Sequence, residues 1–371
     1  MQLVFALARY FPFGGLERDM LCIARVALER GHGVEVLTGQ WDGPRCADVP
    51  VEELGLSGIT NHGRVWDFAR RFQRAMESRP DRVAVGFSKI PGLHAYYAAD
   101  PCFVDRAHRT RPALYRATLR YRSYARLEQA VFSHAADTQI LLIAPAERAR
   151  FQSAHGTPPE RFCAVPPGID RGRIRPCDAE AVRAVVRRAL DAGASEPVLL
   201  CVGSGFRTKG LDRSIRAFAA LAREQPALLW VVGVGDDASY RRLARELGVG
   251  ERVRFLGGRD DVARLLWSAD VLLHPARAEN TGTVLLEALV AGLPVVASSV
   301  CGYAPYIAAA GMGSVVEEPD DTAELLRALR AVLATDPALW RARGAAFAAH
   351  ADVFRGAGRV VDALETRWGS S

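Results

Sequence analysis

Short apolar runs alternate with amphipathic, helix-like stretches along almost the whole chain. In the first half, five runs are typical of buried strands, and helical patterns lie between several of them: Leu3–Ala8, GVEVLT (33–38), Val83–Phe87, His94–Ala98 and Gln139–Ile143. This alternation predicts a parallel sheet with crossover helices.

A second domain is expected after PPGIDRGRIRP (166–176), which breaks both periodicities and is typical of a linker. Six further runs follow it: VLLCVG, LLWVVG, VRFLGG, VLLHPA, PVVASS and GSVVEE. Their consecutive apolar positions suit strands covered on both faces, and 371 residues are enough for two cores. We therefore expect an α/β protein with two Rossmann-like, doubly wound domains facing across a cleft, at residues 1–167 and 168–345. A helical tail over 346–371 would pack back on them.

The stretch ENTGTVLLEALVAGLP (279–294) follows one of these strands, at the carboxyl edge where doubly wound sheets bind ligands. Thr281 or Thr283 can cap a helix there, and Gly282 allows a ligand close to the backbone. The amides of Gly282, Thr283 and Val284, at the positive end of the helix dipole, predict a phosphate site.

Two glutamates flank this helix start, with seven residues between them. Glu287 could accept hydrogen bonds from ribose hydroxyls, and Glu279 could hold sugar hydroxyls. A capping carboxylate and a solvated glutamate are the structural alternative. The loop VGSGFRTKG favours binding, because it places Lys209 six residues after Gly203 at the same edge. There an ammonium suits a diphosphate oxygen.

The turn FPFGGLERD follows the first strand and predicts the opposite wall of the cleft. Gly14 and Gly15 would let a ligand approach the backbone, with the carboxylate of Asp19 behind them. The third glycine of a dinucleotide fingerprint is missing, so a nicotinamide site is not indicated. The alternative is a plain helix start in which Glu17 and Asp19 satisfy the dipole.

Arginine dominates the 48 basic residues, and only Lys89 and Lys209 are lysine. Lysine is expected where a compact ammonium on a flexible stem is needed, although chance is the alternative. Charge is concentrated between Phe103 and Phe132, where seven arginines face two acids, an excess of five in a chain of net charge +6.

A helix from Pro112 to Phe132 would place arginines on one side and apolar or small residues on the other: Arg116, Arg120, Arg122 and Arg126 against Leu114, Tyr121, Ala125 and Phe132. Tyr115, Leu119 and Leu127 interleave with the arginines. This mixture favours an anionic membrane surface. A solvated face and nucleic acid are the alternatives, but no nucleic-acid motif accompanies the helix.

The compartment expected is the cytoplasm. No run of about 18 apolar residues could span a bilayer. The apolar start MQLVFALARYFPFGG lacks a basic beginning and a cleavage site, so it predicts a first strand rather than a signal peptide. The seven cysteines lack C-x-x-C spacing, which indicates neither a disulfide framework nor a zinc site.

The Gly-Gly turn, the Gly-to-Lys loop and the two spaced glutamates together resemble the retaining glycosyltransferases of family 4, which have the GT-B fold. Longer stretches resemble the bacterial lipopolysaccharide core glucosyltransferases I: YFPFGGLERDM, TNHGR, GFSKIPGL, AADPCF, RFCAVPPGI and LLEALVAGLPVVASSVCGYAPYIA. That resemblance covers nearly the whole chain. It implies transfer of glucose from UDP-glucose to a heptose of the lipopolysaccharide inner core, with retention and without a metal or other cofactor. Together with the basic segment, this predicts a cytoplasmic enzyme that is peripheral on the cytoplasmic face of the inner membrane.

The resemblance assigns roles to residues on the donor side. Lys209 would bind the diphosphate, Glu279 the glucose hydroxyls and Glu287 the ribose. The backbone of residues 281–284 would hold phosphate and sugar. Arg173 would lie near the donor, and Arg259 of GGRDD would frame the uracil.

Two features of the resemblance leave alternatives open. Ser204 stands where the family usually has an arginine, and Arg207 is the candidate replacement cation. Gly15 and Asp19 would lie near the anomeric carbon and the acceptor hydroxyl. Retention requires a carboxylate nucleophile, Asp19 or less plausibly Asp100, or same-face attack as UDP leaves. We favour same-face attack with Asp19 orienting the acceptor.

The rival functions are a related family 4 transferase with another nucleotide sugar or acceptor, and a catalytically silent sugar-nucleotide binder.

Overall fold

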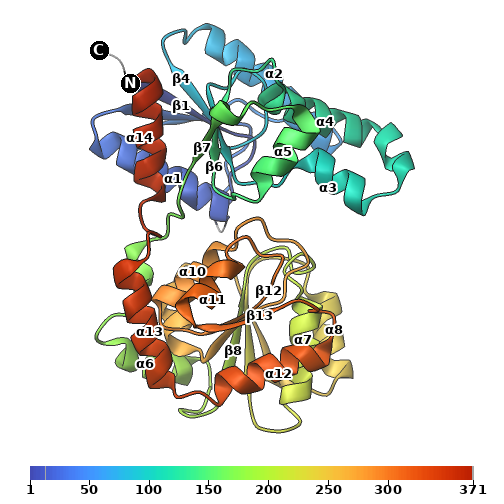
Figure 1. Cartoon of the computed structure of the whole chain (residues 1–371), viewed down its shortest axis with the longest axis vertical. Helices are drawn as coiled ribbons and strands as arrows, with labels where there is room; N and C mark the ends of the chain where they lie inside the picture. The colour runs from blue at the N-terminus through green and yellow to red at the C-terminus, as the bar shows by residue number, and fades with distance from the viewer. Residues whose placement is uncertain (13, 370–371) are drawn as a thin grey trace. The chain divides into compact units, whose positions relative to one another are not determined.

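The computed structural model describes residues 1–12 and 14–369 and divides into two compact units. The first contains Met1–Gly168 together with the chain from Arg355 onward, and the second contains Ile169–Phe354. Both units are parallel α/β structures, which confirms the predicted fold class (Figure 1). Phe13 of the predicted Gly-Gly turn lies outside the described residues.

The first unit has a sheet of seven parallel strands in the order β3-β2-β1-β4-β5-β6-β7. The strands are β1 Gln2–Leu7, β2 Gly33–Thr38, β3 Val51–Glu53, β4 Val83–Gly86, β5 Ala95–Ala98, β6 Gln139–Leu142 and β7 Phe162–Ala164. The helices are α1 Gly15–Glu29, α2 Asn61–Glu77, α3 Phe103–Thr110, α4 Leu119–Phe132, α5 Glu147–His155 and α14 Gly356–Trp368, with 3₁₀ turns η1 Ala113–Ala117 and η2 Pro159–Arg161.

The second unit has a sheet of six parallel strands in the order β10-β9-β8-β11-β12-β13. The strands are β8 Val198–Val202, β9 Leu228–Val232, β10 Val253–Gly257, β11 Val271–His274, β12 Val295–Ser298 and β13 Gly313–Val316. The helices are α6 Ala179–Ala189, α7 Leu211–Leu221, α8 Ala238–Glu246, α9 Val262–Ser268, α10 Thr283–Val290, α11 Ala304–Ala310, α12 Thr322–Leu333 and α13 Pro337–His350, with η3 Arg171–Arg173 and η4 Gly250–Arg252.

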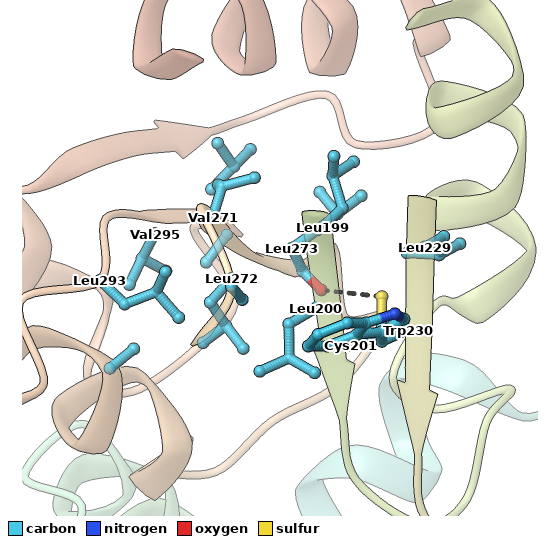
Figure 2. Packing of buried hydrophobic residues seen from close by; sticks show 14 of the residues in the cluster. Leu199, Leu200, Cys201, Leu229, Trp230, Val271, Leu272, Leu273, Leu293 and Val295 are labelled. Atoms are coloured by element: carbon cyan, nitrogen blue, oxygen red, sulfur yellow. Dashed lines mark hydrogen bonds between the residues drawn. The ribbon is translucent and has the colours of Figure 1, made fainter. Parts of the chain in front are cut away.

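The strands form because their consecutive apolar residues are covered on both faces. In the second unit Leu199, Leu200 and Trp230 are fully buried, and Figure 2 shows them among the packed side chains of this core. The thiol of Cys201 donates to the carbonyl of Leu273 at 3.2 Å, which ties β8 to β11. The six predicted strands of this unit are confirmed.

The strand order reverses once in each sheet, between β1 and β4 and between β8 and β11. Loops leaving the carboxyl ends of strands on either side of such a reversal diverge, so they leave room for a ligand. The loops after β8 and β11 carry Lys209 and Glu279, and the loop after β1 leads to Gly15.

The predicted helix over residues 112–132 is confirmed over 119–132, as α4, and is wrong over 112–118. The structure has the 3₁₀ turn η1, then Thr118, whose hydroxyl caps α4 by accepting from the amide of Tyr121. This break changes the predicted apolar side, because Leu114 is 84% exposed while Phe132 is fully buried. The short edge strands β3 and β7 were not predicted, since three residues carry too little periodicity.

The C-terminal tail divides between the units. Helix α13 belongs to the second unit and crosses the predicted boundary at residues 345 and 346. Helix α14 lies alongside α1 in the first unit (Figure 1), where Arg30, the C-cap of α1, contacts Asp362 at 2.7 Å and Glu365 at 2.9 Å. Across the described residues, every helix is too short or too polar to cross a membrane.

Candidate active site

The loop after β8 brings Lys209 to the strand-order reversal of the second sheet. Gly203 has a φ of +139°, and the stem of Lys209 passes over it, so that a Cβ there would lie 3.1 Å from the Lys209 Cε. Gly210 follows with a φ of +71° and leaves no room for a side chain, because an added Cβ would lie 2.1 Å from the carbonyl oxygen of Pro275. The loops after β8 and β11 are therefore in close contact.

Arg277 fastens these two loops together. Its backbone N–H donates to the carbonyl of Thr208 at 2.8 Å, and its guanidinium binds both carboxylate oxygens of Asp212 at 2.6 and 2.8 Å. The sequence interpretation missed this residue, because an arginine in an arginine-rich chain carries no local signal of a long-range partner.

Lys209 and Glu279 form an ion pair through Nζ and Oε2. Glu279 is largely buried and also contacts Nε2 of His274 at 3.1 Å. Burial by itself would raise the pKa of Glu279, but the hydrogen bond with His274 and the Lys209 charge lower it to about 2. Glu279 is thus a fixed carboxylate, and His274, at the end of β11, holds it in place.

The segment from Glu279 to Thr281 lies beside the loop after β12. Glu279 pairs with Cys301 as an isolated parallel bridge, and the amide of Tyr303 donates to the carbonyl of Thr281 at 2.8 Å. A Cβ on Gly302 would lie 2.0 Å from the Asn280 carbonyl oxygen, so only glycine allows this approach. His274 and Gly302 were missed, since their roles depend on contacts between distant loops.

Helix α10 begins with open amides. Gly282 is the N-cap with a φ of +85°, and no side chain caps the helix, so the predicted capping by Thr281 or Thr283 is wrong. The N–H groups of Gly282, Thr283 and Val284 have no hydrogen-bond acceptor among the described residues. Three open donors at the positive end of a helix dipole can bind an anion such as phosphate.

Glu287 lies one turn further along α10 and is 3% exposed. Its Oε1 lies 3.6 Å from Nε of Arg173 on η3, whose carbonyl accepts from the Trp267 indole at 3.1 Å. The structure therefore brings together two residues assigned separately to the donor. Arg207 is exposed and has no ion pair within the described part of the chain, and Arg259 forms a two-point ion pair with Asp261 in its own loop, both at 2.7 Å.

In the first unit, Asp19 accepts a hydrogen bond from the hydroxyl of Tyr97 at 3.1 Å, which links α1 to the end of β5. Gly15 faces open space, since an added Cβ would meet no atom within 4 Å. Asp100 follows β5 and is exposed.

Glu17 is a buried acid beside these groups, and the sequence interpretation treated it as a simple helix-start residue. Burial raises its pKa to about 7, and the charges of Asp100 and Asp19 add to the effect. Its carboxyl folds back over Gly14, where an added Cβ would lie 1.6 Å from Oε2. The first unit thus gathers three carboxyl groups near the start of α1.

Comparison with known proteins shows which family has this architecture. A family model described as "Glycosyltransferase Family 4" matches residues 13–173, and one described as "Glycosyl transferases group 1" matches residues 182–346. The chain is 41% identical over 339 residues to "Lipopolysaccharide glucosyltransferase WaaG" of Escherichia coli (strain K12), covering 91% of each sequence. The chain belongs to the WaaG family of glycosyltransferases.

Solved structures agree with this assignment. The chain matches "Crystal Structure of WaaG, a glycosyltransferase involved in lipopolysaccharide biosynthesis" with a TM-score of 0.93 and 38% identity, over 98% of this chain and 99% of that one. The GT-B fold implied by the sequence resemblance is thereby confirmed. A match at 19% identity and a TM-score of 0.76, over 99% of this chain and 100% of the other, to "Crystal structure of Anabaena Alr3699/HepE in complex with UDP-glucose" supports the fold alone.

Proposed function

We propose that this WaaG-family protein transfers glucose from UDP-glucose to a heptose of the lipopolysaccharide inner core, with retention of the anomeric configuration. The observation that carries the proposal is the arrangement of Lys209, Glu279 and the open start of α10 at one strand-order reversal. A cation and three unpaired amides suit a diphosphate, and a fixed carboxylate suits sugar hydroxyls. The close relation to a lipopolysaccharide glucosyltransferase supports the choice of donor sugar and acceptor.

The chemistry requires stabilisation of negative charge on the departing UDP. The Lys209 ammonium and the α10 amides are fixed before reaction, so they can meet this charge without reorganisation. Glu279, with a pKa of about 2, stays ionised and accepts hydrogen bonds from the sugar. With the charge met by protein groups, we propose that no metal is needed. Retention would come from same-face attack, with Asp19 orienting the acceptor hydroxyl and Tyr97 holding Asp19.

The basic segment supports a peripheral membrane location, on the cytoplasmic face of the inner membrane. Arg116, Arg122 and Arg126 are exposed and have no ion-pair partner among the described residues. Leu114 and Leu119, 84% and 74% exposed, project from the same segment. Exposed cations beside exposed leucines suit anionic lipid headgroups over an apolar interior.

A screen of nucleotide sugars tests the proposed function. Purified protein would be incubated with each donor and a lipopolysaccharide truncated after the inner-core heptoses, with UDP release and product mass as readouts. We expect transfer from UDP-glucose, an α-linked product by NMR, and full activity in excess EDTA. Transfer from another nucleotide sugar alone would identify a related transferase. Donor binding without transfer would identify a silent binder, and activity restored only by magnesium or manganese would refute the metal-free chemistry.

A further inference from the structure

A pocket of about 340 Å³ lies at the carboxyl edge of the first sheet. Its polar lining comes from three places in the chain, the loops after β4 and β5 and the helical segment that follows: Ser88 and Lys89, Asp100, and Arg106, Arg120 and Tyr124. The volume is in the range of small-ligand sites, which begins at roughly 300 Å³. All of these residues belong to the first unit, so the pocket is separate from the donor-side residues.

Lys89 is held rigidly at the pocket wall. Its Nζ donates to Glu128 at 2.6 Å and to the carbonyl of Pro101 at 2.9 Å. Burial by itself would raise the pKa of Glu128, but Lys89 and hydrogen bonds from His155 and the Phe103 amide lower it to about 2. An ammonium has three N–H donors, and the third has no hydrogen-bond acceptor among the described residues.

Arg106 and Arg120 bring uncompensated charge to the same pocket. Neither guanidinium has a hydrogen bond or an ion pair with any residue that the structure describes. Asp100 is the one acid that lines the pocket, against three cations. Glu128 does not line the pocket and neutralises the charge of Lys89. Arg106 and Arg120 then outnumber Asp100, so the pocket has an excess of positive charge.

Hydroxyl groups and an aromatic wall complete the lining. The Tyr124 hydroxyl has no hydrogen-bond partner among the described residues, and its ring packs against Phe103 with centroids 5.4 Å apart. Ser88 Oγ accepts from the Ala8 amide at 3.0 Å, which leaves its own proton available for donation. Asp100 and these hydroxyls suit sugar hydroxyls, whereas the two arginines suit an anion.

We propose that this pocket binds the acceptor saccharide through a negatively charged group, phosphate or carboxylate, that the saccharide carries. The inference rests on the proposed function and deepens it, because it names the chemistry by which the acceptor is recognised. Arg106, Arg120 and the third N–H of Lys89 hold the anion, and Asp100 accepts from a neighbouring sugar hydroxyl. A lipid headgroup shares the anionic chemistry, but a recess at the sheet edge that includes a carboxylate suits a sugar better than a flat lipid surface.

The test is direct binding of a water-soluble oligosaccharide, obtained by deacylating inner-core lipopolysaccharide, measured by calorimetry without nucleotide sugar. Arg106→Gln/Arg120→Gln should weaken binding by at least about 100-fold, since charged hydrogen bonds contribute roughly 10- to 100-fold each. Arg106→Lys/Arg120→Lys keeps the charge and should recover most of the affinity. The control Arg74→Gln/Arg216→Gln removes two charges from exposed, unpaired helix positions of the described chain and should bind as wild type does.

Two further measurements separate the possible failures. UDP affinity should be the same in all variants, and absence of UDP binding by the wild type would refute the proposed function without touching the pocket. Wild-type oligosaccharide affinity in Arg106→Gln/Arg120→Gln would overturn the acceptor proposal. If the same variant loses binding to anionic vesicles but keeps its affinity for the oligosaccharide, the acceptor proposal is overturned and the pocket is assigned to lipid headgroups. Failure of the wild type to bind the oligosaccharide at all would overturn it as well.

Discussion

The ammonium of Lys209 is ion-paired with the carboxylate of Glu279, although 70 positions separate the two residues in the chain. The two side chains are partly buried, and each neutralises the charge of the other. Loss of either one therefore affects stability as well as any role in binding, and experiments on this pair must measure both.

Lys209→Ala should lower the rate of transfer by about 30- to 1000-fold, because a cation that meets the charge on departing UDP is lost. It should also lower the free energy of unfolding by about 1–3 kcal/mol, since Glu279 keeps its contact with His274 but loses the ammonium that compensates its charge. Lys209→Ala/Glu279→Ala should be more stable than the sum of the single changes predicts, which denaturant titration of all four proteins would show. Wild-type turnover by Lys209→Ala would remove the assignment.

Glu287→Gln should weaken UDP binding by about tenfold or more, because a charged hydrogen bond to the ribose becomes a neutral one. The side chain keeps its volume, so packing beside Arg173 is preserved. Calorimetry with UDP and with its 2′-deoxy and 3′-deoxy analogues gives the specific readout. The variant should lose discrimination between UDP and the analogue that lacks the contacted hydroxyl. Equal discrimination by both proteins would place Glu287 outside the ribose site.

Glu17 should make stability depend on pH. Its pKa is raised by burial from 4.5 to about 7 in the folded protein, so the folded state binds the proton more tightly. The stabilisation is present below pH 4.5 and is lost as pH rises through 7, about 3 kcal/mol in total.

Glu17→Gln should therefore gain stability over the wild type between pH 5 and pH 8, measured by urea unfolding. Glu29→Gln, at an exposed position of the same helix, is the matched control and should show no such gain. A wild type and a Glu17→Gln variant with parallel pH profiles would contradict the raised pKa.

Arg116→Gln/Arg122→Gln/Arg126→Gln should weaken binding to anionic vesicles by about 100-fold, at about 1 kcal/mol for each arginine near the surface. Arg120 is left intact because it lines the acceptor pocket. High salt should have the same effect on the wild type, since it screens these charges. The control Arg74→Gln/Arg216→Gln/Arg223→Gln removes the same charge elsewhere and should sediment with vesicles as the wild type does. Equal sedimentation of the triple variant at low salt would refute the membrane role of this segment.

Local sequence patterns were enough to predict the two sheets and the edge where ligand-binding residues gather. Runs such as VLLCVG and VLLHPA are apolar on consecutive positions, and only strands covered on both faces accommodate that pattern. Gly203 and Gly282 were recognisable for a similar reason, because turns leaving such strands require small residues, and both have positive φ angles.

Which side chains contact one another depends on how the chain folds, and no local pattern predicts it. The partners of Glu279 are Lys209 and His274, and no local pattern encodes a contact between loops that follow different strands. The pKa of Glu17 is raised by burial of its carboxyl group and by the negative charge of Asp100, a residue far from Glu17 in the sequence. The helix predicted from Pro112 begins only at Leu119, because the Thr118 hydroxyl accepts from the Tyr121 amide and caps the helix there. Periodicity is a property of neighbours along the chain, whereas charge compensation and burial depend on residues that folding brings together.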